Sequence, residues 1–222
     1  MRKLVISTFV SLDGVLQAPG TPDEDPTGGF EHGGWTFHYW DDVMMQAMGE
    51  AMAAPFDLLL GRRTYEIFAA HWPYAGDDPA ARPLNAATKY VVSTTLRELT
   101  WGPAQLITGD VPAEIARLKE QDGPDLQVNG SSVLVQTLLA HGLADELRVW
   151  TFPVVLGKGK RLFGSGAVPA GFTLADSKAS TTGVVMTTYR PAGPVKLGTF
   201  ATQEPTQAEL ERRRKLAAEE VP

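Results

Sequence analysis

The sequence contains no cysteine, which excludes disulfide scaffolds, zinc–thiolate sites, iron–sulfur clusters and thiol nucleophiles. It also has no apolar run approaching the roughly 20 residues that a bilayer span requires. Basic residues are in the minority, because 20 Lys and Arg stand against 26 Asp and Glu and leave a formal net charge of −6. A nucleic-acid binder usually carries a basic excess. We therefore expect neither a membrane nor a nucleic acid as a partner.

Several site motifs are missing as well. No G-x-G-x-x-G follows a predicted strand, no G-x-S-x-G occurs, and Gly157–Lys160 lacks the spacing of a P-loop. The four histidines, at positions 32, 38, 71 and 141, include no pair at i, i+4 spacing. With no cysteine to assist them, we expect no metal site.

The length of 222 residues and the hydrophobic content of 43% fit one globular domain. Residues 1–10 have a basic start and a short apolar run, which Ser7 and Thr8 interrupt. A signal peptide would need a longer apolar region and a cleavage site, so these residues instead predict a buried β-strand. We expect a cytoplasmic location.

Short apolar strands alternate with helices along most of the chain, which predicts an α/β fold with a mainly parallel central sheet and flanking helices. The last strands have no helix between them and should pair antiparallel at one edge. The predicted strands cover 4–10, 57–61, 89–93, 104–108 and 126–129, the predicted helices cover 43–54, 64–70, 112–120 and 131–141, and the closing extended segments cover 146–156, 172–179 and 184–190.

Three segments fall outside this alternation. Residues 11–39 form a long predicted loop whose aromatic second half packs as a lid, either on its own domain or over a ligand. Residues 71–87 are predicted as loop. We expect the domain to cover 1–191 and a C-terminal tail to cover 192–222, with a charged helix over 204–220. That helix presents a solvated face, or alternatively serves as a dimer arm or partner-binding helix.

Three predicted strand ends carry residues suited to ligand binding, because open α/β sheets bind ligands beyond the carboxyl ends of their strands. Gly61–Thr64 and Asn129–Val133 each join a strand to a helix N-terminus, where free backbone N–H groups favour an anion. Arg62 and Arg63 add forked donors that match phosphate. The alternatives are a solvated arginine pair and a plain capped helix start. Ser93 and Thr94 could meet a ribose or a phosphate, although a turn would use the same hydroxyls.

A carboxylate follows the first predicted strand, in the sequence Ser11-Leu12-Asp13-Gly14. Taken by itself, Asp13 is best explained as part of its own turn with Gly14. Asp41 and Asp42 open the next predicted helix, where acidic side chains favour the positive end of the helix dipole. All three carboxylates therefore have a structural explanation beside a functional one.

These motifs, in this order, resemble the dihydrofolate reductase-like superfamily, and more closely the reductase domain of bacterial riboflavin biosynthesis and its stand-alone relatives. The resemblance spans about residues 2–191. It is carried by the segments 9–15, 58–66, 90–93, 128–131 and 145–163, which include Phe9-Val10-Ser11-Leu12-Asp13-Gly14-Val15 and Leu60-Gly61-Arg62-Arg63-Thr64-Tyr65-Glu66.

The resemblance implies an NADPH-dependent reductase that transfers a hydride to a C=N or C=O bond of a small pteridine- or pyrimidine-like substrate. It implies a homodimer with a small-molecule substrate. The cofactor-binding residues it implies are Gly14 beside the nicotinamide, Gly61, Arg62, Arg63 and Thr64 on the phosphates including the 2′-phosphate, Ser93 and Thr94 at the adenosine end, and Asn129, Gly130, Ser131, Ser132 and Val133 on the pyrophosphate.

The same resemblance implies that the substrate lies between the Ser11–Gly14 turn, the aromatic loop and the segment 157–163, with Trp40, Leu156 and Phe163 as contacts. Asp13 is the first candidate for the carboxylate that orients the substrate or passes a proton through water, and Asp42 is the second. A competing hypothesis is a dinucleotide- or ligand-binding protein on the same fold that performs no turnover.

Overall fold

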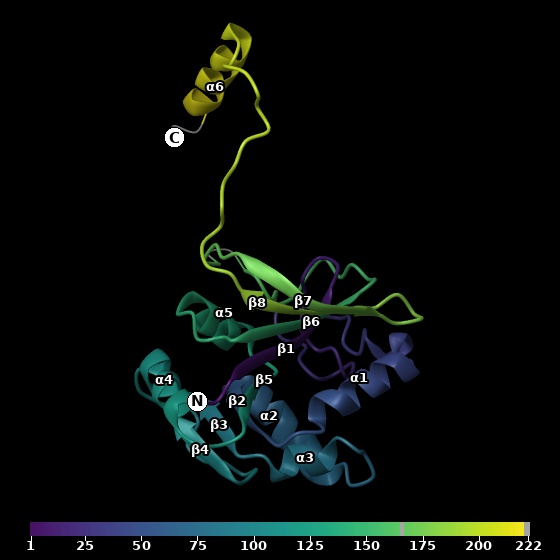
Figure 1. The fold of residues 1–222 in the computed structure, drawn as a ribbon. Helices are drawn as coiled ribbons and strands as arrows, with labels where there is room; N and C mark the ends of the chain where they lie inside the picture. Colours follow the sequence, from purple (N-terminus) through teal and green to yellow (C-terminus); the bar gives the residue numbers. More distant parts are fainter. Residues whose placement is uncertain (165–166, 220–222) are drawn as a thin grey trace.

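The computed structural model describes residues 1–164 and 167–219, and its centre is a sheet of eight strands in the order β4-β3-β2-β5-β1-β6-β8-β7 (Figure 1). The strands are β1 Leu4–Ser11, β2 Phe56–Gly61, β3 Lys89–Val92, β4 Ala104–Ile107, β5 Asp125–Val128, β6 Glu146–Phe152, β7 Phe172–Ala179 and β8 Val185–Pro191.

Strands β1 to β6 pair in parallel, and β7 and β8 add an antiparallel edge next to β6. This arrangement confirms the predicted mainly parallel sheet with antiparallel edge strands. Because the first six strands are parallel, their carboxyl ends lie along one edge of the sheet, and the loops that follow them are brought together there.

Helices cover both faces of the sheet, because apolar side chains alternate along the buried strands. On one face, α4 (Val111–Glu120) and α5 (Ser132–Ala140) pack against the side of β2 that carries Leu59. On the other face, α2 (Arg62–His71) and α3 (Ala81–Ala86) pack against Leu58 and Leu60. Helix α1 (Asp42–Met52) covers that second face near β6, where Met44 contacts Trp150 and Phe152.

Two local predictions were wrong. Helix α2 begins at Arg62, directly after β2 ends, two residues earlier than its apolar pattern suggested. Within the predicted loop 71–87, the structure has a 3₁₀ turn over Trp72–Tyr74 and the short helix α3. Pro83 lies in the first turn of α3, where a backbone N–H would have no partner within the helix, so proline is tolerated there.

The long loop after β1 packs on its own domain. Trp35 and Tyr39 lie edge-on to Phe152 with ring centroids 5.3 and 5.8 Å away, and Phe30 is buried with Val15 and Ala18. The loop also contains a 3₁₀ turn over Phe37–Tyr39. These contacts fit the first of the two alternatives, a lid packed on its own domain, and the second alternative, a lid over a ligand, stays a prediction.

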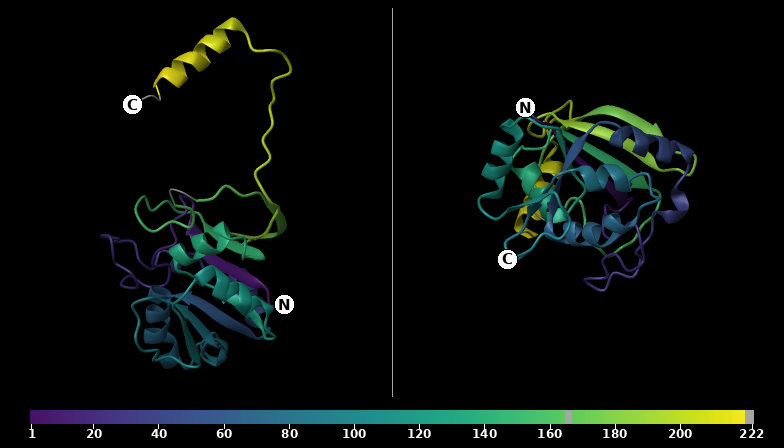
Figure 2. Two further views of the ribbon diagram at one scale, coloured as in Figure 1. Left: turned by 90° about the vertical axis from the view of Figure 1, so that its left-hand side faces the viewer. Right: turned by 90° about the horizontal axis from the view of Figure 1, so that it is seen from below.

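Beyond β8, an extended segment leads to α6 (Gln207–Glu219), which stands apart from the sheet in Figures 1 and 2. The side chains of Leu197 and Phe200 in this segment are fully exposed. Hydrogen bonds from Arg212 and Arg213 lower the pKa of Glu209 to about 2, so these three charged side chains are paired within the helix.

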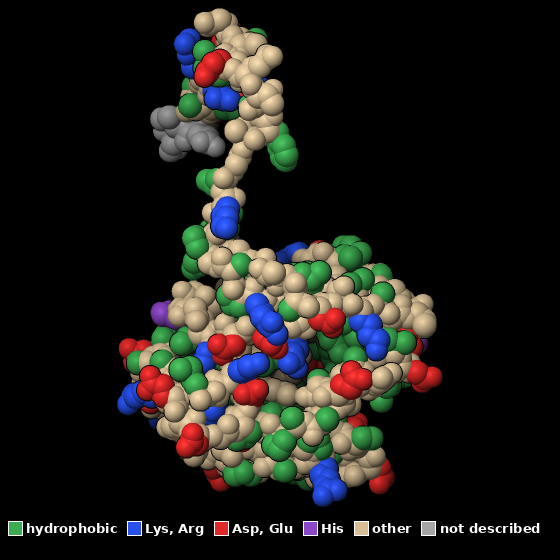
Figure 3. Space-filling model, in the orientation of Figure 1, with side chains coloured by type: hydrophobic (Ala, Val, Ile, Leu, Met, Phe, Trp, Pro, Cys, Tyr) green, Lys and Arg blue, Asp and Glu red, His purple; other side chains and the backbone are tan. Residues whose placement is uncertain are grey.

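Acidic and basic side chains are intermixed over the face of the domain that Figure 3 shows. Over residues 1–164 and 167–219, no helix is both long and apolar enough to cross a membrane.

Candidate functional site

The candidate site lies along the edge where the parallel strands end. Strands β3, β2, β5, β1 and β6 are consecutive neighbours in the sheet, although they come from distant parts of the sequence. The turns that follow them therefore form a continuous row. They carry Ser93, Gly61–Thr64, Asn129–Val133, Ser11–Gly14 and the segment after Phe152.

The turns after β2 and β5 are in direct contact. The N–H of Gly61 donates to the carbonyl of Gly130 over 3.2 Å. A Cβ on Gly61 would meet the Ser131 hydroxyl, and it would lie 3.0 Å from the Ser131 nitrogen. Gly130 has φ +137°, and a Cβ there would lie 2.8 Å from the Thr64 hydroxyl. Both glycines are therefore required by the close approach of two helix starts.

Polar groups at the start of α5 lack hydrogen-bond partners among the described residues. Ser131 occupies the N-cap position but its side chain makes no capping hydrogen bond, so the expected serine cap is absent here. Asn129 Oδ1 is buried and has no hydrogen-bond partner among the described residues. Buried polar atoms in proteins are nearly always paired, and exceptions occur where a ligand or water binds. The residues at this turn therefore fit a group that donates a hydrogen bond and carries negative charge nearby.

The two arginines of the first turn of α2 have different partners. Arg62 pairs with Glu66 one turn along the helix at 3.0 Å, and both side chains are more than two-fifths exposed. Such an exposed pair contributes little to stability and can open for a ligand. Arg63 reaches across to the long loop, where its Nη1 donates to the Asp25 carboxylate at 3.3 Å and to the Thr27 hydroxyl at 3.0 Å.

Asp13 joins the turn after β1 to the segment after β6. Its carboxylate accepts hydrogen bonds from the Ser11 hydroxyl at 2.6 Å and from the N–H groups of Leu156 at 3.0 Å and Gly157 at 2.9 Å. Nη2 of Arg161 lies 3.3 Å from the same carboxylate. The Ser11 hydroxyl, followed by the Leu156 and Gly157 N–H groups, lowers the pKa of Asp13 from its ordinary value of 3.8 to about 2. At neutral pH Asp13 is therefore an ionised hydrogen-bond acceptor that can orient a group but does not donate a proton.

Replacing Asp13 with asparagine is expected to lower the free energy of unfolding at neutral pH by about 1–3 kcal/mol, because charge-assisted bonds to two backbone N–H groups weaken. The depressed pKa of Asp13 contributes stability above its unfolded value of 3.8, and this contribution is lost as the pH falls towards about 2. The difference between the wild type and the variant should therefore shrink over that window in urea titrations. Equal stability of the two proteins at neutral pH would contradict this role.

Asp42, the second candidate carboxylate, has no comparable hydrogen-bond network within residues 1–164 and 167–219. Asp41, rather than Asp42, caps α1, since its carboxylate accepts from the Met44 N–H at 2.9 Å and from Thr181 at 2.7 Å. Asp42 is exposed in the first turn of α1. Trp40 precedes this turn and packs against Phe9 and Trp150, with ring centroids 5.7 and 5.8 Å away. Its assignment as a substrate contact stays a prediction.

The remaining predicted residues lie at both ends of the row. The Ser93 hydroxyl accepts from the N–H groups of Thr95 and Leu96 at 3.1 and 2.9 Å, which is the turn geometry considered as its alternative role. Thr94 is exposed. At the other end, Leu156 is partly buried against Val15 and Phe30, and Phe163 is half exposed.

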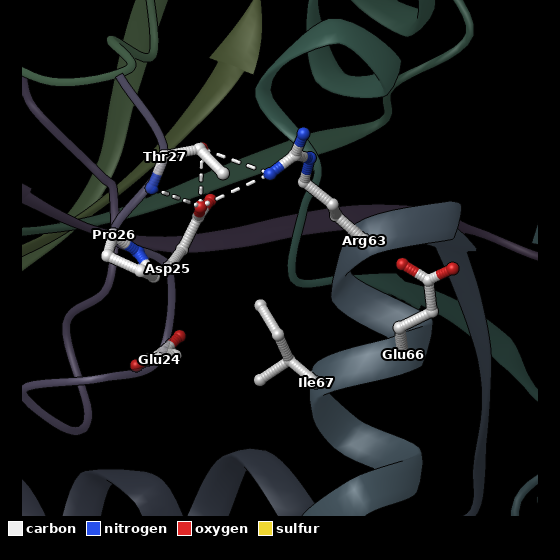
Figure 4. A pocket seen from close by; sticks show the side chains of 7 residues that line it. All are labelled: Glu24, Asp25, Pro26, Thr27, Arg63, Glu66 and Ile67. Atoms are coloured by element: carbon white, nitrogen blue, oxygen red, sulfur yellow. Dashed lines mark hydrogen bonds and ion pairs between the residues drawn. The ribbon is translucent and has the colours of Figure 1, made fainter. Parts of the chain in front are cut away.

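Four residues of the site were missed by sequence reasoning. Asp25 is buried and accepts from Lys160 Nζ, while the Thr27 hydroxyl accepts from the same amine at 2.9 Å. The Gln17 side chain donates to the carbonyls of Asp25 and Thr27 at 2.8 and 2.9 Å. Figure 4 shows Asp25, Thr27 and Arg63 pointing toward one another beside a cavity of about 200 Å³. The signals in the sequence were the acidic run 23–25 within the predicted lid and the position of Lys160 in the segment 157–163, which the resemblance placed beside the substrate.

A model of the RibD C-terminal domain matches residues 2–186. The chain belongs to the RibD C-terminal domain family. The match ends within β8, so α6 and the segment before it lie outside the part that defines the family.

Relatives of this RibD C-terminal domain protein cover nearly the same length. The uncharacterized protein YyaP of Bacillus subtilis (strain 168) is 29% identical over 196 residues, which are 85% of this chain and 94% of that protein. A putative riboflavin biosynthesis protein from Shewanella sp. PV-4 superimposes with a TM-score of 0.61 and 24% identity, over 86% of this chain and 99% of the other.

Dihydrofolate reductase from Enterococcus faecalis, complexed with NADP(H) and RAB-propyl, superimposes with a TM-score of 0.54 and 14% identity, over 86% of this chain and 96% of the other. At these identities the solved structures establish the fold, which is dihydrofolate reductase-like. The expected family and fold are both confirmed, and the fold is of a reductase type.

Proposed function

We propose that this protein is a reductase that binds NADPH and reduces a C=N or C=O bond of a small pteridine- or pyrimidine-like substrate. The proposal is supported most by one observation: two helix starts meet at the carboxyl edge of the sheet, and beside them Asn129 Oδ1 is buried without a partner among the described residues. Helix N-termini at this edge favour the phosphates of a dinucleotide.

When bound, NADPH supplies the hydride, and the protein contributes binding and orientation. The N–H groups of Arg62, Arg63 and Thr64 and those at Asn129–Val133 would hold phosphates, whereas the N–H of Gly61 is already bonded to the Gly130 carbonyl. The absence of a side chain at Gly130 permits close approach. Asp13 would hold the turn beside the reacting ring and orient a polar substrate. Because its carboxylate stays ionised, the proton that completes the reduction would come from water.

The direct test is a fluorescence titration with NADPH, for which the five tryptophans provide a signal. It is followed by an assay of NADPH consumption with a dihydropterin, a ribosylamino-pyrimidinedione and a panel of small carbonyl compounds. Consumption that depends on one of these substrates is the expected result. Absence of NADPH binding would contradict the proposal.

A prediction concerns the choice between the two nicotinamide cofactors. Replacing Arg62 with alanine should weaken NADPH binding about 10- to 150-fold, the equivalent of one charge-assisted bond of about 1.5–3 kcal/mol, and should leave NADH binding nearly unchanged. The matched control is Arg82→Ala on α3, which should affect neither cofactor. Equal losses for NADPH and NADH in Arg62→Ala would contradict the assignment of the 2′-phosphate to this residue.

A second candidate function is binding without turnover, as a dinucleotide-dependent ligand sensor. The state of Asp13 favours this alternative, because the carboxylate nearest the predicted nicotinamide position is committed to loop N–H groups and does not donate a proton. Tight NADPH binding with no consumption across the whole substrate panel would support the sensor.

A further inference from the structure

The long loop after β1 places an anion between two cations of the candidate site. We call residues 20–29 of this loop the strap. Asp25 in the strap is only 8% exposed. Its carboxylate lies 3.3 Å from Arg63 Nη1 and also forms an ion pair with Lys160 Nζ. Arg63 belongs to the first turn of α2, and Lys160 belongs to the segment after β6, so Asp25 ties two parts of the site together.

The strap is held in this position by further contacts. The Thr27 hydroxyl donates to Asp25 at 2.6 Å, and it accepts from Arg63 at 3.0 Å and from Lys160 at 2.9 Å. The buried side chain of Gln17 holds the strap backbone at Asp25 and Thr27. Burial raises the pKa of Asp25, but hydrogen bonds from Lys160 and Thr27 outweigh this and keep the pKa below its ordinary value.

The donors around Asp25 suit a phosphate better than a carboxylate. Two full positive charges face a single negative charge, whereas a phosphate monoester carries about −1.5 to −2 charges and three strong acceptor oxygens. An arginine fork, an ammonium group and a hydroxyl are common phosphate ligands. The adjoining cavity has a volume of about 200 Å³. Pockets that enclose a whole small-molecule ligand have volumes of about 300–1,000 Å³, so this cavity suits one group of a larger ligand.

We propose that Arg63, Lys160 and Thr27 form a seat for a phosphate group of the ligand, and that Asp25 fills this seat until the phosphate replaces its carboxylate. Ligand binding and release of the strap are then one exchange of anions. The proposal rests on the proposed function, because it concerns the same site, and it assigns Lys160 and Thr27 to ligand binding.

Two further acids line the cavity without competing for the seat. Glu66 is paired with Arg62 at 3.0 Å. The carboxylate of Glu24 accepts from the N–H groups of Gly20 and Thr21 at 2.6 and 3.2 Å, and burial raises the pKa of Glu24. Arg63 and Lys160 therefore have Asp25 as their anionic partner, and its removal leaves both cations available.

The test is the variant Asp25→Asn, which removes the charge and keeps the shape of the side chain. Adenosine 2′,5′-bisphosphate, NADPH and NADH are titrated into the wild type and the variant by calorimetry. We expect phosphate ligands to bind about 10- to 150-fold more tightly to the variant, because one charge-assisted competitor is lost. The control Asp23→Asn makes the same charge change at an exposed strap position and should alter affinity less than about twofold.

The three ligands distinguish which phosphate occupies the seat. If the Asp25→Asn variant binds only the bisphosphate and NADPH more tightly than the wild type does, the 2′-phosphate occupies the seat. If its affinities for NADPH and NADH rise equally, the diphosphate occupies the seat. Either result supports the seat. The gain should disappear in Asp25→Asn/Lys160→Met and in Asp25→Asn/Arg63→Met. The proposal is overturned if no phosphate ligand gains, if Asp23→Asn behaves like Asp25→Asn, or if the gain survives loss of both cations in turn.

A measurement on the unmodified chain makes the test independent of how well the variants fold. Saturating bisphosphate should accelerate amide hydrogen exchange in residues 20–29, because the strap loses its ion pairs; unchanged or slower exchange would overturn the seat. Failure of the seat and of the reductase are separable. If NADPH is consumed but Asp25→Asn binds phosphate ligands no more tightly, the reductase proposal stands and the seat is overturned. If Asp25→Asn binds them more tightly but no substrate is turned over, the seat stands and the reductase proposal is overturned.

Discussion

Replacement of Arg2 with methionine is expected to lower the free energy of unfolding by about 3–5 kcal/mol, which is typical when one partner of a buried ion pair is removed. The guanidinium of Arg2 is buried and pairs with the carboxylate of Asp57, and its Nε donates to the Pro124 carbonyl at 2.5 Å. It also lies 5.5 Å from the ring centre of Tyr90. The variant would leave the Asp57 carboxylate buried without its cation.

The neighbouring residue is a matched control. Lys3 has a side chain that is 61% exposed and lies 4.0 Å from Glu146, so Lys3→Met should change stability by less than about 0.5 kcal/mol. Both variants are compared by urea unfolding at neutral pH.

A double variant separates the orphaned charge from the lost packing. Asp57→Asn keeps an oxygen that can accept the Thr88 N–H, now bonded to Asp57 at 3.0 Å, and removes the carboxylate charge. Arg2→Met/Asp57→Asn should therefore be more stable than Arg2→Met alone. Two results would show that an unpaired buried Asp57 carboxylate is not the cause of the instability. One is a decrease in the free energy of unfolding of less than about 1 kcal/mol in Arg2→Met, and the other is a double variant that is less stable than Arg2→Met.

The second large effect is expected at Gly61. An alanine there would bring Cβ onto the Ser131 hydroxyl and to 3.0 Å from the Ser131 nitrogen, so the two helix starts would have to separate. Overpacking of this kind costs about 1–3 kcal/mol of stability. Under the proposed function, it should also weaken NADPH binding at least about tenfold, since each 1.4 kcal/mol of lost phosphate contacts is a factor of ten.

Two companion variants make the Gly61→Ala result specific. A Cβ on Gly76 meets nothing within 4 Å, so Gly76→Ala should stay within about 0.5 kcal/mol of the wild type. Ser131→Ala removes the hydroxyl that the new methyl group would meet, so it should restore part of the loss when combined with Gly61→Ala. Additive effects in this cycle would show that the new methyl group does not meet the Ser131 hydroxyl.

Most of the sheet could be predicted from the sequence, because each strand and the turn after it are marked by residues within one short segment. Apolar runs of four to eight residues marked the strands, and β2 and β5 each end in a glycine-containing turn before a helix. Acidic residues at the start of α1 marked its N-terminus, although only the structure identifies Asp41 as the capping residue. The dihydrofolate reductase-like resemblance then followed from the order of these turns.

The parts that escaped prediction depend on contacts between distant segments. The role of Asp25 requires the path of the long loop over α2, and no local pattern encodes that path. The same holds for Asp13, whose partners Leu156 and Gly157 lie 143 and 144 residues away. Sequence reasoning found the carboxylate but could not show that backbone N–H groups from the far segment fix its charge. Helix α3 was missed for a different reason, since a proline in a first turn looks like a loop residue.

The central position of β1 has a consequence for how the chain folds. Its neighbours are β5 and β6, and the N–H of Leu4 bonds to the carboxylate of Asp145, 141 residues along the chain. A native topology dominated by such long-range pairings has a high contact order and a slow search for the transition state. During synthesis, β1 leaves the ribosome before both of its neighbours, so its two edges are covered only after β5 and β6 have been made. Until then it is an apolar strand with unpaired edges, and this is the stage at which the chain is most exposed to aggregation.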